Sequence, residues 1–197
     1  MSLTQLASDI ATVLSEVDSK TRGQYGDGLG SEDEERQLDL LFDALKEYDS
    51  NYTAVNREVS YPTTAERCDI QLPDGLPIEA KLLRYWRANG DPEHHMPKQV
   101  FSPFHENTLL SDAERLLDSE FESPCGLLGL FYKRADDDPE AVKALPERFT
   151  AGNLAEKVRQ DIEYWYECTA SVECVASVND LQHRVHKQGA VITWKIV

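Results

Sequence analysis

The chain has 197 residues, of which 41% are hydrophobic, and this length and content suit a single domain with a buried core. No run of about eighteen apolar residues and no signal-peptide pattern is present, which excludes a membrane-spanning protein and predicts a soluble, cytoplasmic one. The net charge of −16 argues against long-range attraction to nucleic acid, which is normally bound by a basic surface.

The charge is spread unevenly along the chain. Residues 1–50 carry 4 basic and 12 acidic groups, whereas residues 51–100 carry 6 and 7. The less negative segment is compatible with binding a phosphate backbone, although an acidic proteome adapted to salt would also explain the net charge. The cysteines have no Cys-x-x-Cys spacing, so reduced thiols are expected rather than a zinc site or a disulfide. They are Cys68, Cys125, Cys168 and Cys174.

The N-terminal part reads as two helices and a strand. Apolar residues at helical spacing predict a first helix that buries Leu3, Leu6, Ile10, Val13, Leu14 and Val17. Four glycines between residues 23 and 30 predict a flexible loop. Ser31 and Glu34 form a capping-box pattern that opens a second helix, with an apolar stripe of Leu38, Leu41, Phe42 and Leu45. Residues 54–60 are expected to form a strand.

A β-hairpin is predicted next, because two alternating runs at residues 67–72 and 77–83 flank a Pro-Asp-Gly turn. The period of two places Asp69 on one face of the first strand, and Glu79 and Lys81 on one face of the second. Burying the two apolar sets fixes the parity of the register, and a five-residue loop at 73–77 predicts that Asp69 lies opposite Lys81. Two carboxylates and a lysine are therefore expected on one side of the hairpin. A solvated polar face would have the same sequence pattern.

The remaining chain alternates helical and strand patterns. We expect a long loop at residues 88–106, a helix near 111–119 and a buried strand at 126–132. After this strand we expect a turn at the aspartates 136–138, a short helix, and a helix at 153–167 with Trp165 on its apolar face. Strands at 169–178 and 190–197 complete the chain. This order predicts an α/β fold in one domain, 1–197, with a central mixed β-sheet flanked by helices. Residues 1–30 would be an N-terminal helix and glycine-rich loop, and residues 31–197 the core.

The residue types on the polar face of the hairpin indicate a chemistry. Two carboxylates on adjacent strands can hold Mg²⁺, a hard cation that accepts oxygen ligands and keeps several waters. A metal there would stabilise negative charge on a phosphoryl group and lower the pKa of a coordinated water. A neighbouring lysine can orient the attacking water and offset charge in the transition state.

Asp69, Glu79 and Lys81 form an Asp-x9-Glu-x-Lys pattern across the hairpin, which resembles the PD-(D/E)XK nuclease superfamily, the restriction-endonuclease-like fold. The resemblance implies that Asp69 and Glu79 bind Mg²⁺ or Mn²⁺, that the carbonyl of Ala80 is a further metal ligand and that Lys81 assists the nucleophilic water. It covers roughly residues 31–85, and the chain departs from the family pattern because no proline precedes Asp69. Residues 101–112 and 183–194 also look like parts of poorly characterised bacterial relatives.

Many members of this superfamily add a glutamate from a helix before the sheet. Here Glu35-Arg-Gln-Leu38 is similar to the Glu-Arg-x-Leu helix of archaeal Holliday-junction resolvases, which favours Glu35 as the fourth site residue and metal ligand. Helical phase does not choose between Glu34 and Glu35, because they flank the apolar stripe on opposite sides. Glu58 on the preceding strand is a weaker third candidate.

Basic and aromatic residues follow the second hairpin strand. Arg84, Arg87 and Lys98 are candidates for nucleic-acid binding, although the arginines could equally pair with neighbouring acids. Base stacking and a core role are both open for Tyr85 and Trp86.

Two histidine pairs are candidate metal ligands. The adjacent pair, His94 and His95, lies in a polar loop and is expected to be exposed. The second pair has i, i+3 spacing without a third ligand, which favours a helix surface or cap, at His183 and His186.

One hypothesis and two alternatives follow. The hypothesis is a metal-dependent endonuclease that hydrolyses phosphodiester bonds, with DNA favoured, by one-step water attack. A homodimer would suit double-strand cleavage, although no interface is evident in the sequence. The alternatives are a catalytically weak or inactive relative that binds nucleic acid or a protein partner, and a small acidic protein with no nucleic-acid role.

Overall fold

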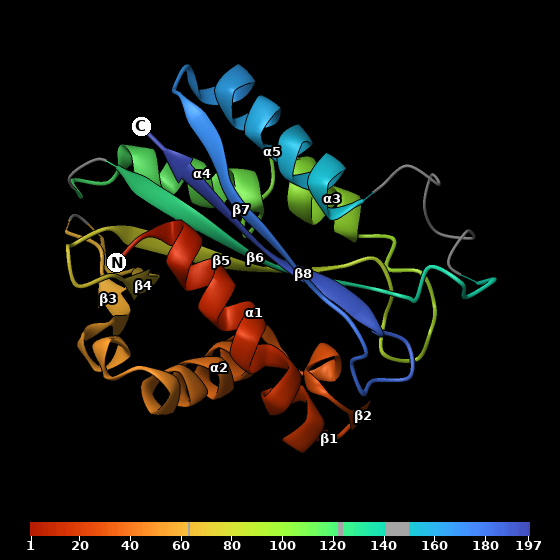
Figure 1. Ribbon diagram of the computed structural model, residues 1–197. Helices are drawn as coiled ribbons and strands as arrows, with labels where there is room; N and C mark the ends of the chain where they lie inside the picture. Colours follow the sequence, from red (N-terminus) through yellow and green to blue (C-terminus); the bar gives the residue numbers. More distant parts are fainter. Residues whose placement is uncertain (63, 122–123, 141–149) are drawn as a thin grey trace.

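A six-stranded mixed β-sheet lies at the centre of the computed structural model, which describes residues 1–62, 64–121, 124–140 and 150–197 (Figure 1). Its strands, in the order β3-β4-β5-β6-β8-β7, are β3 Asn56–Ser60, β4 Arg67–Gln71, β5 Pro77–Arg84, β6 Cys125–Lys133, β8 Gln188–Ile196 and β7 Ala170–Val178. β5 and β6 pair in parallel, and the other neighbouring strands pair antiparallel. The parallel pair needs a crossover, which the chain makes through α3 (Met96–Phe101) and α4 (Leu109–Asp118).

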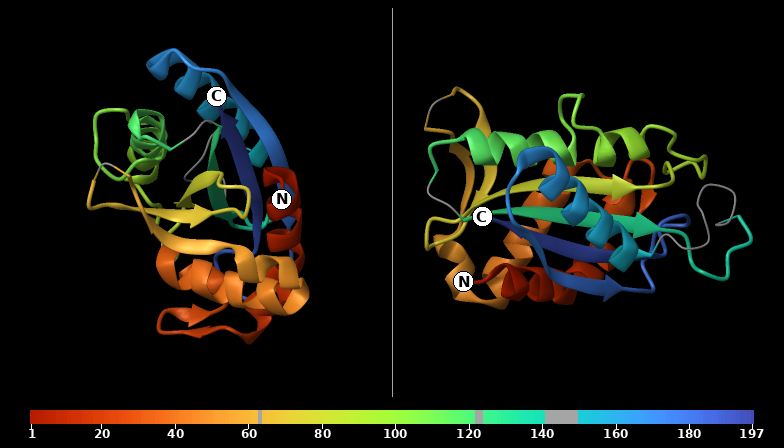
Figure 2. Two further views of the ribbon diagram at one scale, coloured as in Figure 1. Left: turned by 90° about the vertical axis from the view of Figure 1, so that its left-hand side faces the viewer. Right: turned by 90° about the horizontal axis from the view of Figure 1, so that it is seen from above.

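Helices cover both faces of the sheet (Figure 2). α1 (Leu3–Lys20) and α2 (Glu34–Tyr48) pack on one face, and α3, α4 and α5 (Ala151–Tyr166) pack on the other. β6 is covered on both sides, which explains its nearly continuous apolar sequence. The predicted α/β fold, with a mixed sheet flanked by helices, is confirmed.

The apolar stripes predicted for the first two helices are buried, since every residue named for α1 and α2 lies in the core. The stripe of α5 is buried at Leu154, Val158 and Ile162, but Trp165 is 42% exposed, so its predicted burial is wrong. α3 lies inside the segment predicted as a long loop at 88–106. The short helix expected after the aspartates falls on residues 141–149, outside the described residues.

The glycine-rich segment contains regular structure rather than only a flexible loop. β1 (Arg22–Gly23) and β2 (Gly26–Asp27) form a small hairpin, followed by the 3₁₀ helix η1 (Leu29–Ser31); a second one, η2 (Ser50–Ala54), follows α2. Gly26 and Gly28 have φ of 134° and 92°, a region that favours glycine. The carboxylate of Asp18 accepts the N–H of Leu29 at 2.7 Å and ties this segment to α1.

The predicted capping box at the start of α2 is wrong. Asp33 is the N-cap residue, and its side chain accepts the N–H of Arg36 at 2.8 Å. Ser31 belongs to η1, where its hydroxyl donates to the carbonyl of Gly26 at 3.1 Å. Because Asp33 caps the helix, the side chain of Glu34 is available for contacts outside α2.

The predicted hairpin register is also wrong, by two residues. Ile70 pairs with Ile78, where Ala80 was expected, so Asp69 is level with Glu79 rather than with Lys81. The cause is a tighter turn, in which the N–H of Leu72 donates to the carbonyl of Leu76 at 3.0 Å. A shift of two residues leaves each side chain on its predicted face.

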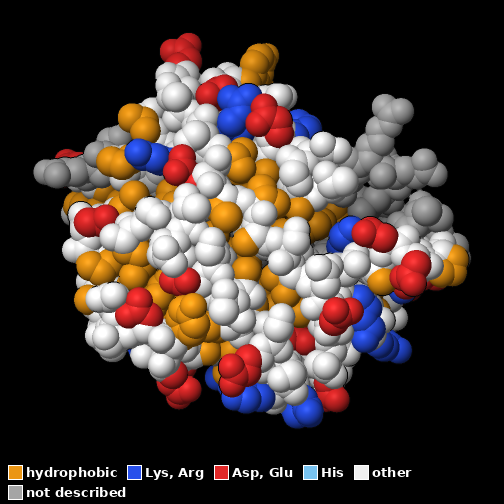
Figure 3. Space-filling model, viewed as in Figure 1, with side chains coloured by type: hydrophobic (Ala, Val, Ile, Leu, Met, Phe, Trp, Pro, Cys, Tyr) orange, Lys and Arg blue, Asp and Glu red, His pale blue; other side chains and the backbone are white. Residues whose placement is uncertain are grey.

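The surface agrees with the acidic composition. On the face shown in Figure 3, acidic side chains are spread widely, and Lys and Arg side chains lie beside them both at the upper end and at the lower end of the view. Within the described ranges, no helix combines the length and the apolar character that crossing a membrane requires. The cysteines are free thiols, as predicted.

Candidate functional site

β4 and β5 pair at only two positions beside their turn and then separate, so part of the β5 edge has no neighbouring strand. Two carboxylates satisfy the backbone there. Asp69 Oδ2 accepts the N–H of Ala80 at 2.7 Å, and Glu34 accepts the N–H of Leu82. Because a strand residue directs its N–H and C=O to the same edge, the carbonyl of Ala80 faces the same opening. Asp69, Glu34 and the Ala80 backbone therefore meet where the hairpin splits.

Glu79 is buried at this split, with 4% of its surface exposed. Its Oε1 accepts a hydrogen bond from the hydroxyl of Tyr61 and lies 3.6 Å from Nε of Arg115. Its carboxyl group is also close enough to Asp69 for that acid to affect its pKa. Burial, and then the adjacent Asp69, raise the pKa of Glu79 to about 9. At neutral pH Glu79 therefore retains its proton, because burial and then the neighbouring Asp69 oppose its ionisation.

Lys81 shares the face of Glu79 and is held between two other carboxylates. Its Nζ lies 2.9 Å from Oδ2 of Asp112 and 3.8 Å from Oε1 of Glu34. Burial alone would lower the pKa of Lys81, but the charges of Asp112 and Glu34 outweigh burial and raise it. Burial raises the pKa of Asp112 in spite of the cations beside it. The raised pKa of Lys81 favours an ionised Lys81–Asp112 pair, whereas the raised pKa of Asp112 favours a neutral one. The 2.9 Å contact between Nζ and Oδ2 has the length of a charge-assisted hydrogen bond and favours the ionised pair.

α4 contributes two residues that were not predicted from the sequence. Asp112 is 1% exposed and contacts Arg115 one turn later. Thr108 and Ser111 cap each other reciprocally and begin the helix, whose buried stripe includes Leu109, Leu110, Ala113 and Leu116. A signal for Asp112 was present in the sequence, because it follows Leu109 by three residues in that apolar stripe. A carboxylate at such a position is buried and needs a partner.

The cluster thus combines four carboxylates with two cations. The carboxylates come from α2, β4, β5 and α4: Glu34, Asp69, Glu79 and Asp112. The cations are Lys81 and Arg115, so the fully ionised cluster would carry two uncompensated negative charges. The alternative of a solvated polar face is wrong, because α4 covers this side of the hairpin and two of the carboxylates are buried. Buried ionisable groups with raised pKa values are a common feature of functional sites.

Two of the predicted glutamates lie elsewhere. Glu35 is exposed on the first turn of α2, and among the described residues no contact joins it to the cluster. Glu58 is exposed on β3, with a φ of 53°. Of the three alternatives left open by the sequence, the structure brings Glu34 to Lys81.

The predicted nucleic-acid-binding residues lie beyond the cluster. The half-buried Arg84 donates through Nη1 to two backbone carbonyls before α2, at 2.9 Å and 3.3 Å. Arg87 pairs with Glu93 at 3.2 Å, and Lys98 is exposed on α3. The aromatic residues between the arginines are buried: Tyr85 and Trp86.

The second histidine pair is buried, so the predicted surface position is wrong. The rings of His183 and His186 stack with centroids 4.7 Å apart, and Nε2 of His186 lies 2.8 Å from the carbonyl oxygen of Trp86. Burial lowers the pKa of both, that of His186 to about 3. These neutral rings extend from the loop before β8 and pack against Gly26 and Gly30 of the glycine-rich segment. His94 and His95 are exposed, as predicted.

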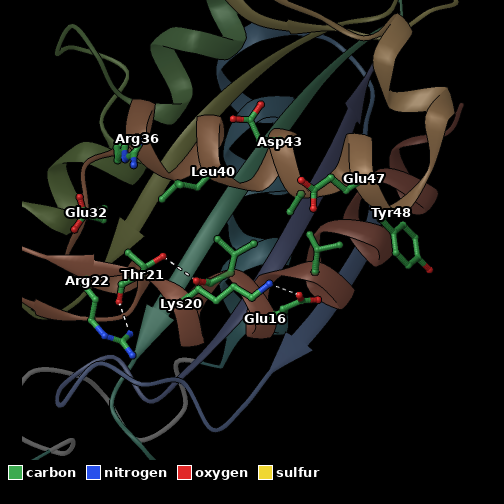
Figure 4. A pocket seen from close by; sticks show the side chains of 13 residues that line it. Glu16, Lys20, Thr21, Arg22, Glu32, Arg36, Leu40, Asp43, Glu47 and Tyr48 are labelled. Atoms are coloured by element: carbon green, nitrogen blue, oxygen red, sulfur yellow. Dashed lines mark hydrogen bonds and ion pairs between the residues drawn. The ribbon is translucent and has the colours of Figure 1, made fainter.

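A cavity of about 630 Å³ lies between α1 and α2, away from the carboxylate cluster (Figure 4). Its lining mixes apolar residues such as Leu40 with charged ones such as Lys20 and Arg36. A smaller cavity of about 330 Å³ is lined by Tyr61 and Arg115, both of which contact Glu79. Access to the carboxylate pair from solvent is therefore expected past Arg115.

The oxygen ligands at the split suit a small divalent cation. Within the described part of the chain, no group of three or more His, Cys, Asp and Glu side chains is close enough to hold a metal by itself. Asp69 and Glu79 provide two adjacent carboxyl groups, and Ala80 provides a backbone carbonyl. Mg²⁺ is usually held by one or two carboxylates and keeps several waters, so these residues fit it.

Comparisons of the chain with protein-family models, curated proteins and solved structures found no match.

Proposed function

We propose that this protein is a metal-dependent nuclease that hydrolyses phosphodiester bonds, with DNA as the first candidate substrate. The observation that carries the proposal is the buried Glu79 next to the half-buried Asp69, beside a charged lysine at the open edge of β5. A stable protein does not need such a pair, because burying Glu79 beside a second acid costs free energy. A site that binds a cation does need it.

Each residue of the cluster has a role in this proposal. Asp69 and Glu79 would hold Mg²⁺ or Mn²⁺, together with the Ala80 carbonyl. When bound, the ion would stabilise negative charge on the phosphoryl group and lower the pKa of a coordinated water. Lys81, kept charged and anchored by Asp112, would orient the attacking water and offset the developing charge. Asp112 is a positioning residue, since it acts through Lys81.

The resemblance to the PD-(D/E)XK nucleases supports the same proposal. Asp69 lies at the split of the hairpin, and Glu79 and Lys81 share one face. Glu34 extends from the helix before the sheet, where many members of that superfamily carry a glutamate.

The test is cleavage of supercoiled plasmid by the purified chain with Mg²⁺ or Mn²⁺, compared with the same reaction in chelator. We expect metal-dependent nicking that is lost in Lys81→Ala and retained in Lys46→Ala, the matched change at an exposed lysine near the end of α2. Circular dichroism verifies that both variants are folded. Absence of cleavage of single-stranded, duplex and branched DNA and of RNA, with either metal, would contradict the proposal.

One observation favours the second candidate, a catalytically inactive protein that binds nucleic acid or a protein partner. Arg115 and Lys81 already contact three of the four carboxylates in the cluster, and Glu79 is nearly inaccessible. This protein would bind without cleaving, and Mg²⁺ would leave its melting temperature unchanged. The nuclease requires a rise in melting temperature as the ion binds.

A further inference from the structure

A third cavity lies where β5 ends, beyond the proposed site. It encloses about 520 Å³ between the β1–β2 hairpin, the segment before α2 and the loop after β5. This volume is within the usual range for a small-molecule ligand. The residues that matter most for recognition are Gln24, Tyr25, Arg84, Trp86, Arg87 and Asn89.

Arg84 gives the cavity a fixed cation. Its Nη1 is held by two backbone carbonyls, and no ion pair joins it to a carboxylate among the described residues. Burial lowers the pKa of Arg84, which reflects the cost of placing an unpaired guanidinium there. A half-buried cation without an acid partner favours an anion in the adjacent space. Arg87 adds a second guanidinium, because its exposed pair with Glu93 is weak enough to exchange for a phosphate.

The cavity also offers surfaces for a planar ring. Tyr25, at the tip of the β1–β2 hairpin, is 66% exposed, although large aromatic side chains are usually at least partly buried. Trp86 forms part of the wall and is fixed by the contact between its carbonyl and His186, but its ring is buried beneath Arg134, so the exposed ring of Tyr25 is the stacking surface. Gln24 and Asn89 add amide groups that can donate to and accept from a base edge.

The acids in the lining make the cavity selective. Glu32, Asp33 and Glu93 face the same space as the arginines, so a free phosphate gains little from entering. A nucleotide has both parts that this lining needs, a phosphate for the guanidinium groups and N–H donors on its base for the carboxylates.

The walls of the cavity are already ordered. The loop after β5 is closed by hydrogen bonds from the N–H of Arg87 to the carbonyl of Asp91, at 2.8 Å, and from the N–H of Glu93 to that of Tyr85, at 2.8 Å. On the other side, Ser31 bonds to the carbonyl of Gly26 and holds the hairpin against η1. A ligand therefore meets a preformed site, which reduces the entropic cost of binding.

The cavity adjoins the carboxylate cluster through two elements. Arg84 follows Lys81 by three residues on β5, which is roughly 10 Å along a strand, and the period of two places the two side chains on opposite faces, so the route between them passes around the open edge of β5. Asp33 lines the cavity, and Glu34, the next residue, contacts Lys81. A single strand that places one phosphate at Lys81 can therefore place a neighbouring nucleotide in the cavity.

We infer that this cavity binds one unpaired nucleotide of a DNA strand, with its base against Tyr25 and its phosphate on Arg84 and Arg87. The inference rests on the proposed function, and it specifies the substrate as single-stranded DNA or a DNA end or junction with unpaired nucleotides. A base in a duplex is excluded, because its face is stacked and its edge is paired.

The test measures binding of a dye-labelled, single-stranded thymidine oligonucleotide to the full chain by fluorescence anisotropy in chelator. We expect Tyr25→Ala to weaken binding by on the order of 5- to 150-fold, the range for losing one stacked base, and Tyr25→Phe to retain it. Tyr48→Ala is the matched control, because Tyr48 is also exposed and lines the cavity between α1 and α2 instead. Arg87→Ala should weaken binding, whereas Arg36→Ala should not.

Three results would overturn the inference: an affinity of Tyr25→Ala equal to that of the wild-type chain, equal binding of a blunt duplex, or an oligonucleotide affinity no greater than that of thymidine monophosphate. The last result would mean that the ligand is a free nucleotide. The same titration on Glu79→Gln separates this inference from the proposed function, because Glu79 belongs to the proposed metal site and does not line the cavity. Binding without cleavage by the wild-type chain would support the cavity and contradict the nuclease, and cleavage unaffected by Tyr25→Ala would do the reverse.

Discussion

Replacing Glu79 by glutamine should make the metal-free protein more stable as the pH rises, relative to the wild-type chain. Glu79 is buried next to Asp69, and its pKa rises from 4.5 to about 9 on folding. Between these two values the unfolded chain has lost this proton and the folded chain keeps it. The stability contributed by the protonated form is therefore fully present below pH 4.5 and is lost as the pH rises through about 9.

The magnitude follows from the single proton involved. One extra proton bound by the folded state lowers the free energy of unfolding by about 1.4 kcal/mol per pH unit. From pH 5 to pH 7.5 the wild-type chain should therefore lose about 3 kcal/mol through this group, and Glu79→Gln should lose none of it. Glutamine also changes the contacts with Tyr61 and Arg115, but that difference is a constant offset and does not alter the slope.

The assay is urea denaturation in chelator, monitored by tryptophan fluorescence at half-unit steps from pH 5 to pH 8.5. The quantity of interest is the difference in unfolding free energy between Glu79→Gln and the wild-type chain at each pH. Glu35→Gln serves as the control, because Glu35 is an exposed glutamate near the same site. A difference that does not change with pH would refute the raised pKa of Glu79, and with it the evidence that this acid is buried beside Asp69.

Three further predictions concern the same cluster. Because Mg²⁺ must displace the proton of Glu79, calorimetry at pH 7 in buffers of different ionisation enthalpy should detect nearly one proton released per ion bound by the wild-type chain and none by Glu79→Gln. Equal heats in all buffers would contradict this. Glu34→Ala should lower the free energy of unfolding by about 1–2 kcal/mol in urea denaturation, because the N–H of Leu82 loses its acceptor, and Glu35→Ala should change it by less than about 0.5 kcal/mol. Asp112→Ala should cost about 3–5 kcal/mol at pH 7, because it leaves Lys81 without its closest carboxylate, and a cost below about 1 kcal/mol would show that the pair is not ionised.

The hairpin shows how far a sequence pattern extends. Alternation of apolar and polar residues determined which face each side chain occupies, and the structure confirms that Glu79 and Lys81 share one. The register was predicted from loop length and is wrong, because Leu72 and Leu76 bond within the turn. Strand parity is a property of neighbouring residues, whereas register depends on how the turn closes.

The choice between Glu34 and Glu35 was decided by packing. In the sequence both residues flank the apolar stripe of α2, and Glu34 looked like a capping residue. Asp33 caps the helix instead, and the separation of β4 from β5 leaves the N–H of Leu82 for Glu34 to satisfy. The separation of two strands is not encoded in the helix sequence, so helical phase could not predict this contact.

The local patterns of this sequence determined the helices with their buried stripes, the strands of the sheet, and the common face of Glu79 and Lys81, because each depends on spacing within one element. Only the tertiary structure brought Asp112 and Arg115 from α4 to that face and joined Tyr25 to Arg84 around one cavity. These residues lie tens of residues apart in the chain. Their meeting depends on the crossover between β5 and β6 and on the packing of the β1–β2 hairpin, which no local periodicity records.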